Sequence, residues 1–264
     1  MGKGYKSLNV CMYCGSTENL TKEHIVNYGI NGELTLKNSS CKSCNGITSR
    51  NEESVLRGQM GQARIVGGLR TRNPENRPDS IKINVSSVTG ESEELDVPIK
   101  EATAFLHIPL FTEASFLSGG KRKAGAEVCG FDTLYFGENP KDFLLKENYH
   151  GITDRVRIDV HAFAKLLAKT AYAFYVAEKG LFPRSESPAL ALMNGELRDT
   201  SIWVGSSFQP LAKKTSELHQ LETKVVKIRT GKEVEIVRVQ LFAPAGTCIY
   251  EVVVRAAKWR LYLK

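Results

Sequence analysis

The sequence predicts an α+β protein, in which a small zinc-bound unit at the N-terminus precedes a larger mixed α+β domain. Four of the six cysteines lie between positions 11 and 44, in two CxxC pairs. Beyond position 79, segments that alternate apolar and polar residues, typical of strands, accompany one segment with an apolar stripe at helical spacing. The polar stretch TRNPENRPDS, residues 71–80, contains two prolines and lies between these two parts. We therefore predict two domains, residues 1–70 and residues 79–264.

The two cysteine pairs predict a structural zinc site. Cys11 and Cys14 form one pair, and Cys41 and Cys44 form the other. Each pair can present two thiolates to one ion, and a tetrahedron of four sulfurs favours Zn²⁺. Such a site is closed to substrate, and it can contribute about 10–16 kcal/mol to the folding of a short segment. Four unrelated thiols are the alternative, and the repeated spacing argues against them.

The segments between and after the cysteine pairs predict two strands and a helix. LTKEHIV, residues 20–26, has strand character. GELTLKNSS, residues 32–40, can return as a second strand after a turn that contains glycine and asparagine. NGITSRNEESVLRGQM, residues 45–60, can continue as a helix.

This order of strands and helix gives three polar residues a possible common site. Glu23 and His24 are adjacent near the end of the first strand, and Asn45 directly follows a predicted zinc ligand. A zinc ion that joins the two cysteine pairs would place Asn45 beside the first strand. Carboxylate and amide oxygens suit Mg²⁺ or Mn²⁺ rather than zinc, and a neutral imidazole next to such an ion can act as a general base.

The larger region predicts one helix and several strands. The helix spans residues 159–180, where Asp159 can cap its start and Gly180 can end it. A hairpin is expected over residues 224–242, with a bulge between Ile236 and Val237, where the apolar alternation changes phase. Other strands are expected at residues 80–88, 126–137 and 201–207 and across the C-terminal stretch 248–263.

Composition narrows the class of protein and of partner. The chain has 264 residues, of which 42% are hydrophobic and 25% are charged, as in ordinary globular proteins. Since no apolar run reaches membrane-spanning length and no signal-peptide core is visible, we expect a cytoplasmic protein outside membranes. The first 77 residues carry eleven Lys or Arg and six Asp or Glu, which is +5 of the total net charge of +7. This concentration of charge favours a polyanionic partner.

The N-terminal 60 residues resemble the HNH endonucleases, also called ββα-metal or His-Me finger nucleases. The resemblance is closest to the branch with two CxxC zinc knuckles, and residues 79–264 show none. Two departures lie in the loop after the histidine: Val26 and Asn27 occupy positions where relatives often have proline, and two residues separate Gly29 from Gly32. The residues that carry the resemblance are Cys11, Cys14, Glu23, His24, Ile25, Gly32, Cys41, Cys44 and Asn45.

The resemblance implies a small zinc-bound ββα-metal nuclease unit and a role for each polar residue. It implies that His24 is the general base that activates water. Glu23, where many relatives have Asp, and Asn45, which replaces a final His, would bind one catalytic Mg²⁺ or Mn²⁺. The implied reaction is hydrolysis of DNA phosphodiester bonds to 5′-phosphate and 3′-hydroxyl products, with double-stranded DNA as the first candidate partner.

Two other functions fit the same residues. The chain can be a catalytically inactive zinc-knuckle nucleic-acid-binding protein, in which Glu23, His24 and Asn45 are ordinary polar positions. A zinc module for protein–protein contacts is the third possibility, and the concentrated basic charge argues mildly against it. Residues 79–264 can serve target recognition, regulation or dimerisation, so a homodimer stays open.

Overall fold

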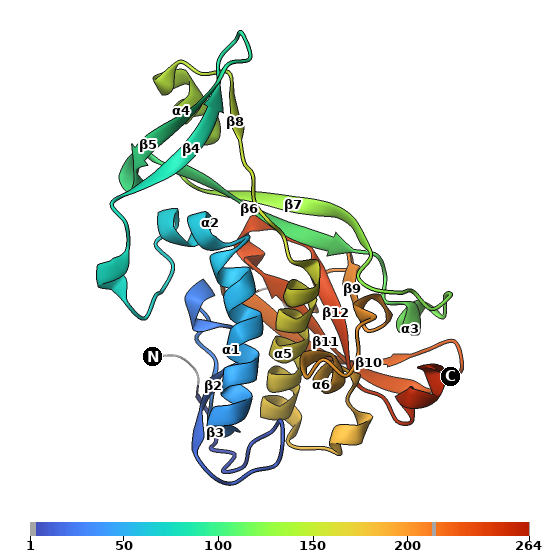
Figure 1. Ribbon diagram of the computed structural model, residues 1–264. Coiled ribbons are helices and arrows are strands. Elements are labelled where there is room, and N and C mark those ends of the chain that lie inside the picture. The colour runs from blue at the N-terminus through green and yellow to red at the C-terminus, as the bar shows by residue number, and fades with distance from the viewer. Residues whose placement is uncertain (1–3, 213–214, 264) are drawn as a thin grey trace.

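The computed structural model describes residues 4–212 and 215–263, and the helix α5 (Val160–Lys179) runs through its middle (Figure 1). The Asp159 carboxylate caps the helix by accepting from the Ala162 amide at 2.9 Å, and Gly180, at φ +85°, ends it. Both ends were predicted from the sequence and are confirmed. Almost every residue between Ala162 and Val176 is buried, so α5 is the central packing element.

Two antiparallel strands and a helix form the N-terminal part, in the predicted order. The strand β2 (Leu20–His24) pairs with β3 (Thr35–Cys41), and the two-residue β1 (Gly4–Tyr5) lies parallel to β3. The helix α1 (Lys42–Arg57) follows β3 without a loop and packs along α5 (Figure 1). The helix thus begins before Asn45, because Cys41 is the last strand residue and also the N-cap of α1.

A four-stranded antiparallel sheet covers the other side of α5. Its strand order is β10-β11-β12-β9. The hairpin is confirmed, but the register shifts between Glu235 and Ile236, one residue earlier than expected and on the side of β12. The expected strand over 248–263 is correct only in its first half. The strand ends at Arg255, and after a turn in which Lys258 has φ +56° the chain continues as a 3₁₀ helix over Trp259–Leu263. The bounds are β9 (Val204–Ser207), β10 (His219–Lys227), β11 (Glu233–Leu241) and β12 (Ile249–Arg255).

A small lobe and a long two-stranded ribbon connect these parts. The lobe consists of the sheet β5-β4-β8 with the helix α4, and the ribbon pairs β6 with β7 (Figure 1). The strands β5 and β6 and the helices α2, α4 and α6 were not expected from the sequence. The bounds are α2 (Gly61–Val66), β4 (Ser80–Ser86), β5 (Ser92–Pro98), β6 (Thr103–Phe111), α3 (Ser115–Ser118), β7 (Val128–Gly137), α4 (Pro140–Glu147), β8 (Gly151–Thr153) and α6 (Pro188–Met193).

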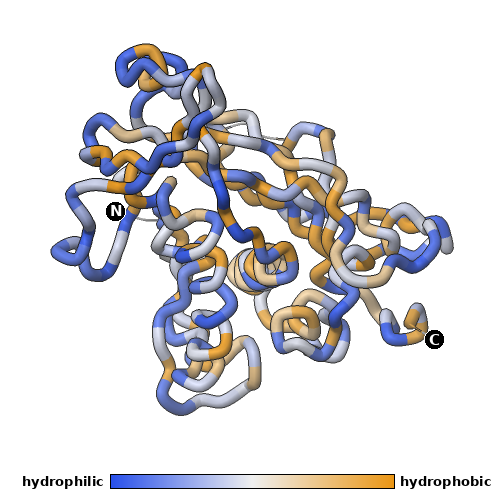
Figure 2. The backbone as a smooth tube through the Cα atoms, turned by 45° about the horizontal axis from the view of Figure 1, so that its top comes forward, coloured by the Kyte–Doolittle hydropathy of each residue, from blue (hydrophilic) through white to orange (hydrophobic). Residues whose placement is uncertain are grey.

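One hydrophobic core joins the N-terminal part to α5 and the C-terminal sheet. It runs from Cys11 to Trp259 and crosses the predicted division after residue 70. The lobe has a separate, smaller core around Ile83 and Phe143. Hydrophobic stretches accordingly gather in the interior of the molecule, and hydrophilic stretches lie mainly in its outer loops (Figure 2). Within the described residues, no helix combines the length and the hydropathy needed to cross a membrane.

Candidate metal centre and adjacent cleft

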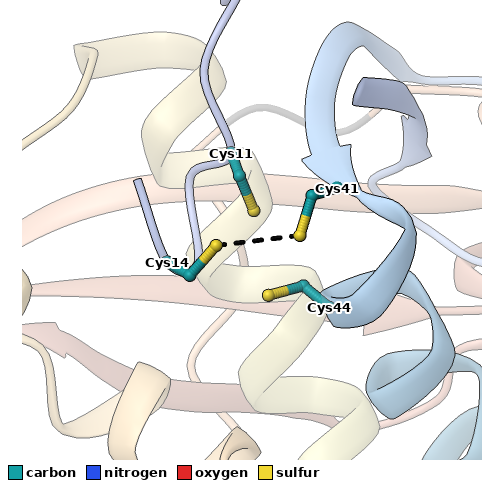
Figure 3. Close-up of side chains that lie close together, drawn as sticks. All are labelled: Cys11, Cys14, Cys41 and Cys44. Atoms are coloured by element: carbon teal, nitrogen blue, oxygen red, sulfur yellow. Dashed lines mark hydrogen bonds between the residues drawn. The ribbon is translucent and has the colours of Figure 1, made fainter. Parts of the chain in front are cut away.

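The four N-terminal cysteines lie together, with their sulfurs pointing toward one another (Figure 3). Their sulfur atoms all lie within 4.8 Å of one another. The Sγ atoms of Cys14 and Cys41 are 3.7 Å apart. Zn–S bonds of about 2.3 Å in a tetrahedron place neighbouring sulfurs about 3.8 Å apart. The cluster therefore has the donor set and the spacing for a structural metal ion such as zinc.

Each cysteine pair is held by its own local structure. Gly15, at φ +85°, turns the first knuckle so that its amide donates to the Cys11 carbonyl at 2.7 Å. The Tyr172 hydroxyl, on α5, donates to the Met12 carbonyl at 2.8 Å, which fastens this knuckle to the central helix. The second pair spans the junction of β3 and α1, so metal binding would join the loop before β2 to the start of α1.

One of the four cysteines, Cys41, favours the thiolate, whereas burial raises the pKa values of Cys14 and Cys44. The backbone N–H of Cys44 beside the Cys41 sulfur lowers the pKa of Cys41 to about 7. Metal binding requires deprotonated cysteine, so this amide prepares Cys41 as a ligand before the ion arrives.

A cleft of about 370 Å³ lies beside the cysteine cluster. Its wall contains Glu23 and His24 from β2 and Asn45 from α1. The three residues that the sequence singled out therefore share one cavity. Lys22, Arg57 and several other arginines lie around them, so the cleft offers positive charge to an anionic ligand. The basic lining residues are Lys22, Arg57, Arg64, Arg70, Arg72 and Lys169.

Asn45 links the helix α1 to the strand β2. Its Nδ2 donates to Thr21 Oγ1 at 3.3 Å, and its Oδ1 accepts from Ser49 Oγ at 3.1 Å. Thr21 Oγ1 in turn donates to the Ser40 carbonyl at 2.9 Å on β3. The side chain thus lies beside the first strand, as the position of Cys44 led us to expect.

Glu23 lies in a buried charged cluster. Its Oε1 is 2.6 Å from the Lys169 ammonium on α5, which is also 3.0 Å from Glu52 on α1. All three side chains are at most 10% exposed. Burial raises the pKa of Glu23, and Lys169 opposes that rise. Burial alone would lower the pKa of Lys169, but the two carboxylates outweigh it and raise that pKa.

His24 presents a neutral imidazole to the cleft. Burial, and then the positive charges of Lys22 and Lys169, lower its pKa to about 4. The ring lies 5.5 Å from the Tyr28 ring, centroid to centroid, and neither ring nitrogen bonds to a described residue. The main-chain carbonyl of His24 accepts a hydrogen bond from Lys169 Nζ. Lys169 therefore fixes the backbone of His24 and the carboxylate of Glu23 together.

Two of the arginines near the cleft, Arg64 and Arg70, hold the loop after His24 in place, so their guanidinium groups do not face the cleft freely. Arg64 donates from its guanidinium to the carbonyls of Gly29, Leu56 and Arg70. Arg70 lies over the Tyr28 ring and pairs with Glu33 at 3.0 Å. Lys22 and Arg72 take part in no ion pair within the described part of the chain.

Gly32 allows the loop after His24 to close. A Cβ atom at this position would lie 2.0 Å from the Val26 carbonyl oxygen, closer than any real contact. The backbone there comes so near that every other residue type clashes. This close approach explains why position 32 of this chain requires a glycine.

Sequence reasoning missed Glu52 and Lys169. Glu52 follows Asn45 by seven residues, which places both on one face of a helix, and that spacing was readable. Lys169 interrupts the apolar stripe of α5, and a lysine inside a buried helix signals a charge partner. The identity of that partner depends on α5 packing against α1 and was not readable from the sequence.

Comparisons with known proteins add no identification: no family model matches the chain, and neither a curated protein nor a solved structure does.

Proposed function

We propose that this protein is a metal-dependent endonuclease that hydrolyses phosphodiester bonds in DNA. One observation carries the proposal: Glu23, His24 and Asn45 line one basic cleft beside a cysteine cluster suited to zinc. In this proposal β2, β3 and α1 form a ββα-metal nuclease unit. The zinc takes no part in the chemistry and joins the first knuckle to the β3–α1 junction.

His24 is the proposed general base. Because its pKa is lowered to about 4, the imidazole is uncharged at neutral pH and has a free lone pair. The ring nitrogen that carries no hydrogen makes no bond to a described residue, so it can accept a proton from a water in the cleft. Lys22 and Arg72 line the same cleft and can attract the phosphate of the substrate.

Glu23 and Asn45 are the residues proposed to hold a catalytic Mg²⁺ or Mn²⁺. The Oε2 atom of Glu23 is buried and has no hydrogen-bond partner among the described residues, so it is an unsatisfied acceptor that a bound cation would satisfy. Glu23 and Glu52 place two carboxyl groups beside one ammonium, and such oxygen donors suit a site completed by substrate phosphate and water. Such an ion, when bound, neutralises charge on the reacting phosphate and stabilises the leaving oxygen.

The test is cleavage of plasmid, single-stranded DNA and RNA by the zinc-loaded protein, with and without added Mg²⁺ or Mn²⁺. We expect His24→Ala to abolish cleavage, by at least about a hundredfold, while keeping the zinc content and thermal unfolding of the wild type. His161→Ala, at an exposed histidine at the start of α5, is the matched control and should cut normally. Undiminished cleavage by His24→Ala would remove the assignment.

A second candidate function is a catalytically inactive zinc protein that binds nucleic acid. The burial of Glu23 and its ion pair with Lys169 favour this candidate, since a carboxylate already paired is a weaker metal ligand. Tight binding of nucleic acid, without cleavage of any of the three substrates, would decide for it.

A further inference from the structure

A second basic cavity lies next to the cleft and shares Arg57 with it. This cavity, of about 240 Å³, lies between the C-terminal end of α1, the strands β4 and β6 and the segment that follows β8. The segment descends from the small lobe to α5 (Figure 1). Arg57 lines both cavities, so the two adjoin at the end of α1. Its side chain is 80% exposed.

The charge of the second cavity is mostly positive and largely unsatisfied. Arg57, Lys82, Arg155 and Arg157 line it, against Asp154 as the acidic lining residue. The Asp154 carboxylate lies within hydrogen-bond distance of His107, with 3.1 Å between Oδ2 and Nε2. Arg155 and Arg157 are exposed and form no ion pair within the described residues.

The other two basic side chains, Arg57 and Lys82, form surface ion pairs whose carboxylates another anion can easily replace. Arg57 pairs with Glu53 at 2.8 Å and Lys82 pairs with Glu94 at 2.6 Å, both on the surface. Exposed pairs of this kind are screened by solvent and contribute little to stability. A phosphate group, which accepts two parallel hydrogen bonds from a guanidinium, can therefore replace the carboxylate beside Arg57.

We infer that the second cavity binds the phosphodiester backbone of the same nucleic acid whose scissile phosphate enters the cleft. The strand passes over Arg57, and phosphates a few nucleotides from the scissile bond contact Arg155 and Arg157. In a duplex each strand carries one phosphate per about 3.4 Å of helix axis, so neighbouring phosphates fall within reach of adjoining cavities. The small lobe thereby has a function, as a backbone clamp. The inference rests on the proposed nucleic-acid substrate, but not on cleavage.

Binding is measured by fluorescence anisotropy on the zinc-loaded His24→Ala protein without added divalent ion, with a labelled DNA duplex as the probe. Adding Arg155→Ala and Arg157→Ala should raise Kd at least about tenfold and reduce the slope of log K against log salt by about 2. The matched control, Lys224→Ala with Lys227→Ala, removes two exposed charges from β10, away from both cavities, and should change Kd less than about twofold.

Two outcomes would overturn the clamp: an unchanged Kd in the arginine variant, or an equal loss of binding in the lysine control. Labelled single-stranded DNA and RNA, measured the same way, show which backbone is held best. If the wild type cuts DNA, the same two arginine substitutions in the wild-type background should raise KM and leave kcat unchanged. If the wild type cuts none of the substrates, the proposed nuclease activity fails, while the binding result still decides about the clamp.

Discussion

At the scale of single residues, Lys169 connects the candidate site to the rest of the protein. An ammonium that is 2% exposed needs charge partners, and Glu23 and Glu52 provide them. Lys169→Met would leave two buried carboxylates facing each other. We expect the free energy of unfolding to fall by about 3–5 kcal/mol, measured by urea denaturation.

Two further variants separate the lost charge from the lost side chain. Lys165→Met, at a partly exposed position one turn earlier in the same helix, should cost less than about 1 kcal/mol. Glu52→Gln added to Lys169→Met removes one negative charge with the positive one and should restore part of the stability. An equal loss in Lys165→Met and Lys169→Met would contradict the importance of the buried pair.

Gly32 and Gly46 provide opposite tests of the same substitution. Gly32→Ala would push a methyl group against the Val26 carbonyl oxygen and should cost about 1–3 kcal/mol in stability. Gly46 lies inside α1 with no atom within 4 Å of an added Cβ, so Gly46→Ala should stabilise by about 0.5–1 kcal/mol. Thermal unfolding measures both effects, and destabilisation of the same size in the two variants would refute the close approach at Gly32.

At the scale of elements, predictability followed the strength of the local signal. The helix α5 has a capping aspartate, an apolar stripe and a terminal glycine, and the hairpin β10–β11 has alternation on both sides of a turn. These two elements could therefore be predicted from the sequence. The strand β5, with the burial pattern of an exposed edge, and the short helices α2 and α6 have no such periodicity, because the surrounding structure selects them.

The candidate site could be predicted from the sequence to a similar degree. The cysteine spacing predicted the cluster, and the order of segments predicted that Asn45 lies beside β2. Glu23 and Glu52 share one partner, Lys169 on α5, which is more than 100 residues away from both in the sequence. Long-range pairing of this kind depends on tertiary packing, which local patterns do not encode.

The cysteine cluster should stabilise its own elements more than the distant sheet. In protein stripped of metal by a chelator, we expect the amides of β2 and β3 to exchange with deuterium much faster, while β11 and β12 keep most of their protection. Adding Zn²⁺ should restore the slow exchange. Cys44→Ser should resemble the stripped protein, and Cys129→Ser, at an exposed cysteine outside the cluster, should resemble the wild type. Equal acceleration in all four strands would show that the effect is global.

At the scale of the whole molecule, the N-terminal part and the C-terminal sheet share one hydrophobic core. Tyr172 holds the first knuckle, Lys169 holds the cleft, and His219 on β10 reaches the loop after His24. The candidate site thus depends on elements that the resemblance does not cover. A fragment of residues 1–70 would expose the surface that α5 buries, and would lack the ammonium of Lys169.

His219 makes this connection sensitive to pH. Its Nε2 donates to the Ile30 carbonyl at 2.6 Å, and its Nδ1 accepts from the Phe242 amide at 3.3 Å, so the bonded ring is neutral. Burial lowers its pKa below the ordinary 6.5. The unfolded chain therefore binds an extra proton below about pH 6.5, and stability that is complete above that pH is lost as the pH falls, by up to about 1.4 kcal/mol per unit.

His219→Gln should lower the unfolding free energy near pH 7.5 but make it less dependent on pH. The glutamine cannot titrate, so urea unfolding between about pH 7.5 and about pH 5.5 should show a shallower decline than in the wild type. His24, whose pKa is also lowered, and the cysteine cluster are present in both proteins, so the difference between the two curves isolates His219. Parallel curves would mean that protonation of His219 does not oppose folding. In that case the hydrogen bond from His219 to the Ile30 carbonyl, which joins the sheet to the candidate site, would not require a neutral ring.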